Sequence, residues 1–326
     1  MEGNSRIMKK IASLTLALTL TAPGLFTGCR DTSGPTARDL LFPPEVINPV
    51  TVAEVHTIFE ELDYSWRNFD GSIPHILFDR LPTDIDTIRS TPKRKQLFFL
   101  MMLPMVLAAN DEIEAERQTL FDIFEKIDGG IELGLDEKSQ LQAFADRYRI
   151  KGDIFSDTLL RQRLLKRVDT IPPSLVLAQA ANESAYGTSR FALEANNLFG
   201  EWTFTPGTGL VPKSRPAGAK YEVRLFNSLL DSIRSYLNNL NSHPAYRKLR
   251  NLRKLMRDRE KTVTGTRLAA GLSRYSARGD EYIEEIRNMI WVNGLEDLAG
   301  LTLRVPERLR RYSRPEVPPY IARAEF

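Results

Sequence analysis

The sequence predicts an α+β fold that is predominantly α. Apolar residues recur at helical spacing through most of the chain, and one segment, residues 202–226, carries a clear strand pattern. Of the 326 residues, 42% are hydrophobic and 27% are charged, which is the balance of a globular chain that buries a sizeable core. No internal repeat is evident. The length allows one large domain or two smaller ones.

The first 29 residues have the pattern of a secretory signal. Basic residues precede an apolar stretch at 11–26, which Pro23 and Gly24 interrupt and which is too short and broken for a comfortable membrane span. The segment FTGC resembles a bacterial lipobox, which implies that Cys29 is lipidated and tethers the mature chain to a membrane. Simple secretion with an incidental cysteine is the alternative. Residues 30–50, rich in Pro, Ser and Thr, are expected to form the tether.

Residues 51–150 are expected to form an N-terminal helical region, in which no chemistry can be identified. Apolar residues at helical spacing begin at Val52, and a second helix is predicted over 92–127. Its apolar block is shorter than a bilayer crossing, so we expect a buried core helix, kinked or split at Pro104. The glycine-rich segment 129–134 interrupts the helical pattern.

Residues 151–300 are assigned to a second domain, followed by a basic, proline-containing tail at 301–326. One helix of the second domain is expected to start at the proline pair 172–173 and to end at Gly187, which suits a left-handed position after a helix. The runs WTFT and YEVRLF, separated by a Gly/Pro-rich loop, predict a β-hairpin. A helix at 135–150 is expected to end the N-terminal region, and the helices of the second domain are expected at 156–171, 174–187, 188–194, 228–240, 244–259, 266–276 and 280–293.

The composition excludes several classes of protein. One cysteine permits no internal disulfide, three scattered histidines build no zinc-ligand spacing, and the nucleotide-binding and nucleophile-elbow motifs are absent. We therefore expect no metal and no cofactor. The net charge is only +3, and nucleic acid is disfavoured as a partner because the chain carries an export signal.

Cations are concentrated in one span near the C-terminus. Asp258 and Glu260 are the only acids between residues 247 and 278. A solvated helix face is the ordinary interpretation, and attraction to anionic polymers or lipid headgroups of an envelope is the functional one. The span holds eleven Lys and Arg residues: Arg247, Lys248, Arg250, Arg253, Lys254, Arg257, Arg259, Lys261, Arg267, Arg274 and Arg278.

Glu183 is the strongest candidate for a catalytic residue. In a helix that starts near residue 174, Val176, Gln179 and Ala180 share a face with Glu183, and that face is apolar except for Gln179. Apolar surroundings and the negative end of a helix dipole both raise the pKa of a carboxyl group. A carboxylic acid that stays protonated near neutral pH is what glycosidic cleavage requires of its general acid. The alternative is a surface glutamate.

The segment AQAANESAYGTSRFALEANNLFG resembles the signature of the bacterial β-N-acetylglucosaminidases of glycoside hydrolase family 73. The shared features are AQAA, the Glu-Ser pair, an aromatic residue before Gly187 and the run NNLFG; a wider similarity, over about 75–295, is to bacterial envelope proteins that carry this domain. The resemblance implies a lysozyme-like fold with a small β-lobe. It also implies that peptidoglycan is cut after N-acetylglucosamine, with Glu183 protonating the leaving oxygen; amidase activity is not expected.

The resemblance leaves the second catalytic group open. Two-carboxylate hydrolysis needs a partner for Glu183, and the candidates are Glu222 in KYEVR, which is slightly favoured, and Glu201 in FGEW. Help from the acetamido group of the substrate would make a second acid unnecessary. Other residues that could line the saccharide groove or order its loops, each with core packing or loop structure as the alternative, are Tyr186, Asn196, Asn197, Trp202 and Tyr275.

Two other functions fit the same residues. A lytic transglycosylase also combines a lysozyme-like fold with one catalytic glutamate and an ES dipeptide, but those enzymes usually carry a GLMQ-type motif where this chain has NNLFGEW. A catalytically weak wall-binding lipoprotein is the alternative from another class, and it would keep binding peptidoglycan after Glu183 is replaced.

Overall fold

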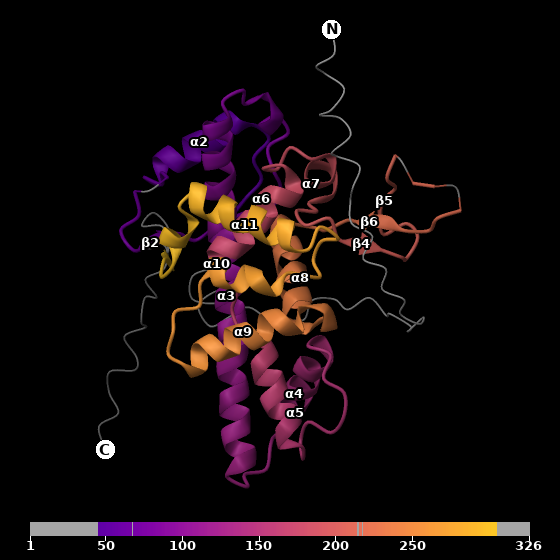
Figure 1. Ribbon diagram of the computed structural model, residues 1–326. Coiled ribbons are helices and arrows are strands. Elements are labelled where there is room, and N and C mark those ends of the chain that lie inside the picture. The colour runs from indigo at the N-terminus through magenta and orange to yellow at the C-terminus, as the bar shows by residue number, and fades with distance from the viewer. Residues whose placement is uncertain (1–44, 67, 214, 217, 305–326) are drawn as a thin grey trace, which may run out of the picture. The chain divides into compact units, whose positions relative to one another are not determined.

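Helices dominate the computed structural model, which describes residues 45–66, 68–213, 215–216 and 218–304 (Figure 1). The predicted α+β, mostly helical fold is confirmed. The signal segment with Cys29, residues 30–44 of the expected tether and residues 305–326 of the basic tail lie outside the described residues. Residues 45–47, also expected in the tether, instead form strand β1 (Glu45–Ile47), because their amide and carbonyl groups pair with β3 (Ile76–Phe78).

The described chain divides into two compact units, each assembled from separate stretches. The first comprises residues 117–178 and 237–297, and the second residues 45–116, 179–236 and 298–304. The predicted boundary near residue 150 therefore lies inside the first unit. Three long helices contribute residues to both units, which is why no single point of the sequence separates them: α3 (Thr91–Asp128), α6 (Pro173–Ser184) and α8 (Leu229–Ser242).

The first unit is helical. Asp157, a residue type favoured at helix N-caps, caps α5: its carboxylate accepts hydrogen bonds from the amides of Leu159 and Leu160. Its elements, besides the parts of α3, α6 and α8, are α4 (Leu135–Arg147), α5 (Thr158–Arg167), η2 (Pro244–Tyr246), α9 (Arg247–Asp258), α10 (Gly265–Leu268), η3 (Ala269–Gly271) and α11 (Asp280–Val292). Residues 295–297 of η4 (Leu295–Leu298) also belong to it.

A buried charge network joins α5, α8 and α9 in the first unit. Arg253 is fully buried, 3.1 Å from Asp169, and it donates to the Asn241 side chain and to the carbonyl of Asp169, each at 2.8 Å. Arg257 also pairs with Asp169. Burial lowers the pKa of Arg253 to about 10, with the Asp169 carboxylate opposing that shift. Arg253 is therefore charged at neutral pH, and its bonds hold one face of α9 against the carbonyl end of α5.

The second unit combines small sheets with helices. Strands β1 and β3 pair in parallel, as do β2 (Ser72–Pro74) and β7 (Thr302–Arg304). The predicted hairpin is confirmed in β4 (Trp202–Thr203) and β6 (Glu222–Arg224), and β5 (Gly209–Leu210) adds a third antiparallel strand on the other side of β6. The remaining short elements of the unit are α2 (Val52–Glu61), η1 (Ile85–Thr87) and α7 (Arg190–Ala195).

Helix α3 continues through Pro104 as one helix, so the predicted split into two helices is wrong. Proline has no N–H, so the carbonyl of Leu100 loses its usual partner one turn later. The hydroxyl of Tyr64 donates to that carbonyl at 3.0 Å, and both groups are buried in the second unit. The orphan acceptor is thereby satisfied from outside the helix, which explains why α3 tolerates the proline.

By length and composition α3 could also cross a bilayer, and among the described residues no other helix could. Of its most apolar stretch, 83% is buried within the protein. The predicted core helix is the interpretation that fits this burial, because a membrane span exposes its apolar side chains to lipid.

Candidate functional site

Glu183 lies in the last turn of α6, as the sequence predicts. Val176, Gln179 and Ala180, the residues expected on its face, are all buried, whereas Glu183 itself is half-buried. The Asn182 amide donates to Glu183 Oε1 at 3.3 Å. The carboxylate therefore emerges from an apolar base at the end of a helix, partly accessible to solvent.

The backbone after Glu183 makes an unusual turn. Ala185, Tyr186 and Gly187 have φ values of 52°, 56° and 80°, three consecutive residues in the left-handed region that only Gly and a few others occupy at low cost. The predicted left-handed position of Gly187 is confirmed. A Cβ there would lie 3.1 Å from side-chain atoms of Leu81 and Phe98, so any other residue would crowd these side chains as well as strain φ.

Ser184 fastens this turn. Its hydroxyl donates to the carbonyl of Ala180 at 2.6 Å and accepts the amide of Gly187 at 2.9 Å, and the side chain is fully buried. One side chain thus ties the last helical turn to the residue that ends it. The two residues of the Glu-Ser pair therefore have different roles: Ser184 fixes the end of the helix from which Glu183 projects.

Tyr186 packs within the second unit. Its ring meets Phe98 and Phe99 edge-on, with centroids 6.1 and 5.8 Å away, and the Lys95 ammonium lies 5.1 Å from the ring centroid. The side chain is half-buried. Packing accounts for its position, and the exposed part of the ring remains available to a ligand.

A polar brace links the helix of Glu183 to α8. Gln179, one turn before Glu183, accepts the hydroxyl of Tyr236 at 2.5 Å, and both side chains are buried. The ring of Phe199 stacks on Tyr236 with centroids 3.9 Å apart and planes 8° apart. Gln179, the polar residue on the otherwise apolar face of α6, therefore has a structural role in bonding to α8. Helix α8 also contacts the NNLFG loop, through Phe199.

The two asparagines of NNLFG organise this loop. Asn196, at a φ of 52°, donates to the carbonyls of Phe226 and Asn227. Asn197 is buried, donates to the carbonyls of Glu201 and Arg224, and accepts the Glu201 amide at 3.0 Å. These contacts hold the loop against β6. The two asparagines thus order the loop, which is the role considered above as the alternative to sugar contact. The bonds of Asn197 also fix the backbone of Glu201.

Glu201 has the electrostatic environment of a reactive carboxyl group. Its side chain is 18% exposed, Oε2 accepts the Ser235 hydroxyl at 2.8 Å, and the Arg224 guanidinium is 3.5 Å from Oε2. Oε1 is buried with no hydrogen-bond partner among the described residues. Burial raises the pKa of the Glu201 carboxyl, while the Ser235 hydroxyl and the charge of Arg224 oppose the rise. Such shifts are frequent at functional sites.

Glu222 occupies a different setting. It is buried in β6, and its carboxylate accepts the amides of Gly207 and Gly209 at 3.0 to 3.1 Å. Both oxygens are engaged by the loop that joins β4 to β5. The geometry is that of a side chain that shapes the β-lobe, and it gives no support to the slight preference for Glu222 over Glu201 as the second catalytic group.

The remaining predicted residues lie in two places. Trp202, 37% exposed at the start of β4, meets Tyr221 edge-on with centroids 4.6 Å apart, and Phe204 nearby is 72% exposed. These aromatic surfaces belong to the β-lobe of the second unit. Tyr275 belongs to the first unit, where its ring stacks on Tyr282 at 5.3 Å, so helix packing accounts for its position there.

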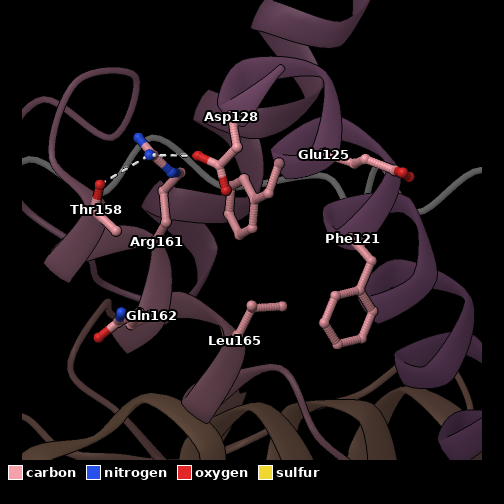
Figure 2. Close-up of a pocket in the computed structure, with 8 residues that line it drawn as sticks. Phe121, Glu125, Asp128, Thr158, Arg161, Gln162 and Leu165 are labelled. Atoms are coloured by element: carbon pink, nitrogen blue, oxygen red, sulfur yellow. Dashed lines mark hydrogen bonds and ion pairs between the residues drawn. The ribbon is translucent and has the colours of Figure 1, made fainter. Parts of the chain in front are cut away.

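The first unit also contains a groove between α3 and α5 (Figure 2). Arg161 spans it, donating to Asp128 and to Thr158 at 2.9 Å each, and Phe121 and Leu165 form its apolar side. The volume is about 400 Å³. None of the predicted site residues lines this groove, and its one buried cation is already paired.

No pattern in the sequence indicates Ser235, Arg224 or Tyr236 as site residues, although each contacts a predicted residue. Ser235 and Tyr236 lie next to each other on α8, so one helix reaches both Glu201 and the helix of Glu183. A serine and a tyrosine inside an amphipathic helix carry no signal of such a role. Only the fold brings them to the site.

Comparison with known proteins identifies the family of this chain. The family model for glucosaminidases, described as mannosyl-glycoprotein endo-β-N-acetylglucosaminidase, matches residues 160–295, a range that includes Glu183, Glu201 and Glu222. Protein bax of Escherichia coli (strain K12) is 34% identical over 202 residues, which cover 61% of this chain and 69% of that protein. No solved structure matches. The predicted lysozyme-like fold is consistent with the glucosaminidase family.

Proposed function

Because this chain belongs to the Bax-like proteins that carry a glucosaminidase domain, we propose that it hydrolyses peptidoglycan at the β-1,4 bond after N-acetylglucosamine. The observation that carries the proposal is Glu183, half-buried at the end of α6 and fixed by Ser184 and the left-handed turn. A positioned carboxyl group at the edge of an apolar base suits protonation of a glycosidic oxygen.

Glu183 is the general acid in this proposal. It donates its proton to the leaving oxygen as the bond to the N-acetylglucosamine ring breaks, and an oxocarbenium-like transition state develops on that ring. Because the turn holds the end of the helix, the carboxyl group meets the substrate with little loss of conformational freedom.

Glu201 is the preferred second group. It belongs to the same unit as Glu183, and α8 contacts both Glu201 and the helix of Glu183 through adjacent residues. A carboxyl group whose pKa is raised toward the working pH exchanges protons efficiently, and its Oε1 is engaged by no other group among the described residues. Glu222 is less suited because its oxygens hold backbone amides. If neither Glu201 nor Glu222 takes part, the substrate's own acetamido group would attack the sugar carbon in place of a second carboxylate.

The place of action in this proposal is the cell envelope. Its support is the signal pattern before Cys29 and the lipobox-like segment around it, which would leave the enzyme exported and tethered to a membrane by acyl chains. No cofactor is part of the proposed reaction, because two carboxyl groups and water supply its chemistry.

Digestion of purified sacculi tests the proposal. The wild type, Glu183→Gln and Glu201→Gln are compared with Glu194→Gln, a matched change at a half-exposed glutamate that pairs with Arg190. Mass spectrometry identifies the products. We expect reducing N-acetylglucosamine ends from the wild type and the Glu194 variant, none from the Glu183 variant, and a shifted pH profile or a strong loss for the Glu201 variant.

The other outcomes identify the alternatives. Anhydro-muramyl ends would reassign the protein to the lytic transglycosylases. No soluble product from any chain, with all of them still sedimenting with sacculi, would leave a wall-binding protein. Equal activity of the Glu183 and Glu194 variants would remove Glu183 from the mechanism.

A further inference from the structure

The first unit presents a cationic surface that the proposed hydrolysis does not use. It is built from the end of α4, from α5 and from α9, and we call it the basic face. Its members are Arg149, Arg163, Lys166, Arg167, Arg247, Lys248 and Lys254. All of them are exposed or half-exposed, and all belong to the same unit.

Contacts bring these cations together from distant parts of the sequence. Arg167 donates to the carbonyls of Tyr148 and Arg149, which joins the ends of α4 and α5. Burial, followed by the positive charges of Lys254 and Arg250, lowers the pKa of Lys166, and Arg247 adds to that effect. The charges of Arg163 and Arg149 likewise lower the pKa of Arg167, after burial. The cations therefore repel one another across three elements.

Acidic partners are scarce on this face. Among the described residues, no carboxylate lies within ion-pair distance of Arg149, Arg163, Lys166, Arg167 or Arg247; Lys254 pairs with Asp258 at 2.8 Å. Arg247 and Lys248 also stand in the first turn of α9, where the helix dipole favours acidic residues. Repulsion between unpaired cations lowers stability, and a helix face whose only role is to be solvated has no need for such a cluster.

The outer stripe of α9 indicates what kind of partner would offset the repulsion. Its exposed residues at helical spacing include Arg247, Lys248, Asn251, Lys254 and Leu255, with 44% of Leu255 exposed. A stripe of basic residues with an apolar side chain among them is typical of a helix that lies on an anionic bilayer surface. A bilayer also presents phosphate groups across a wide area, which matches cations spread over three elements.

We infer that the basic face is a docking surface for a membrane of anionic phospholipid, separate from the glycosidase site and independent of the lipid anchor. Each Lys or Arg near such a surface contributes about fivefold in binding at moderate ionic strength. Long-range attraction of this kind weakens as salt screens the charges.

Vesicle co-sedimentation tests this inference with the full chain carrying Cys29→Ser, so that no acyl group can bind. Vesicles of phosphatidylcholine alone measure any uncharged attachment, including that of the N-terminal apolar residues. Vesicles with one quarter phosphatidylglycerol add the anionic surface. We expect tighter binding to the second kind, and we expect that difference to fall as salt rises from 50 to 500 mM, concentrations chosen to span about 14 to 4 Å of screening length.

A matched pair of variants locates the effect. Arg247→Glu with Lys248→Glu should weaken binding to the anionic vesicles by ~25-fold or more, at about fivefold per cation removed. Arg89→Glu with Lys93→Glu makes the same change of net charge at exposed positions of the second unit and should leave binding nearly unchanged. Circular dichroism confirms that both variants are folded.

Three results would overturn the inference. Equal losses in the two variants would show a net-charge effect without a docking surface. No loss in either would remove the basic face from membrane binding. A loss of sedimentation with sacculi, while vesicle binding is kept, would assign the face to an anionic wall polymer. Digestion of sacculi is measured separately, so failure of this inference leaves the proposed hydrolysis standing.

Discussion

The pairing of Tyr64 with the Leu100 carbonyl makes a specific energetic prediction. Tyr64 is 3% exposed, and its hydroxyl is 3.0 Å from the carbonyl that Pro104 leaves without an amide partner. Tyr64→Phe keeps the aromatic packing, including the edge-on contact with Phe59 at 5.2 Å, and removes only the hydroxyl. A buried carbonyl is then left unpaired, which should lower the free energy of unfolding by ~1–3 kcal/mol.

A second substitution distinguishes this mechanism from a general packing effect. Pro104→Ala restores an amide N–H within reach of the Leu100 carbonyl, as in any regular helix. In that background Tyr64→Phe should lower the free energy of unfolding by less than ~1 kcal/mol, because the new amide takes over the acceptor. The double-mutant cycle should therefore give a coupling energy of about 1 kcal/mol or more.

Urea denaturation of the four chains, followed by tryptophan fluorescence and far-ultraviolet circular dichroism, measures the cycle. Equal slopes against denaturant would show that the variants unfold to comparable states. If Tyr64→Phe destabilises both backgrounds equally, the hydroxyl does not compensate for Pro104, and the explanation of the unbroken helix is wrong.

Four further predictions concern the candidate site and the first unit. Ser184→Ala should lower the free energy of unfolding by ~1–3 kcal/mol and reduce sacculus digestion, because it releases both the Ala180 carbonyl and the Gly187 amide; a thermal melt and a digestion assay check it. Gly187→Ala should lower the melting temperature more than Gly207→Ala, since both have a φ of 80° but only the former would crowd Leu81 and Phe98. Ser235→Ala should raise the pKa of Glu201 further, because the Ser235 hydroxyl favours the ionised carboxylate. The loss in free energy of unfolding, measured by urea titration, should therefore be about 1 kcal/mol larger at pH 7 than at pH 4. The control Ser232→Ala, which loses only a bond from the Leu198 amide, should show the same loss at both pH values. Asp169→Asn should lower the free energy of unfolding by ~3–5 kcal/mol in a urea titration, because it leaves the buried Arg253 without its counter-charge, and a loss below 1 kcal/mol would show that backbone carbonyls suffice.

In this chain, residue patterns predict the structure of short segments, but they do not predict contacts between residues that are far apart in the sequence. The helix of Glu183 follows from spacing, the left-handed position of Gly187 follows from glycine, and the strand pairing of WTFT with YEVRLF follows from composition. The unbroken course of α3 does not, because the donor that repairs the proline defect is Tyr64, 36 residues from Leu100.

The choice between Glu201 and Glu222 was beyond the sequence for the same reason. Both are single glutamates near a predicted hairpin, and what separates them is the partner that each one meets. Glu201 meets Ser235, 34 residues further along the chain, whereas Glu222 meets two loop amides that any residue could have supplied. The two-unit division was equally hidden, because helices such as α6 contribute residues to both units.

The turn after Glu183 has a consequence for engineering. Left-handed backbone at two L-residues, Ala185 and Tyr186, stores about 1–2 kcal/mol each in the folded state. Selection for thermostability alone should recover part of that energy by placing glycine or asparagine there. Such variants would relax the backbone that orients Glu183, the proposed general acid, so heat resistance and turnover are expected to change in opposite directions at these positions. A library randomised at residues 185 and 186 would expose this trade-off directly.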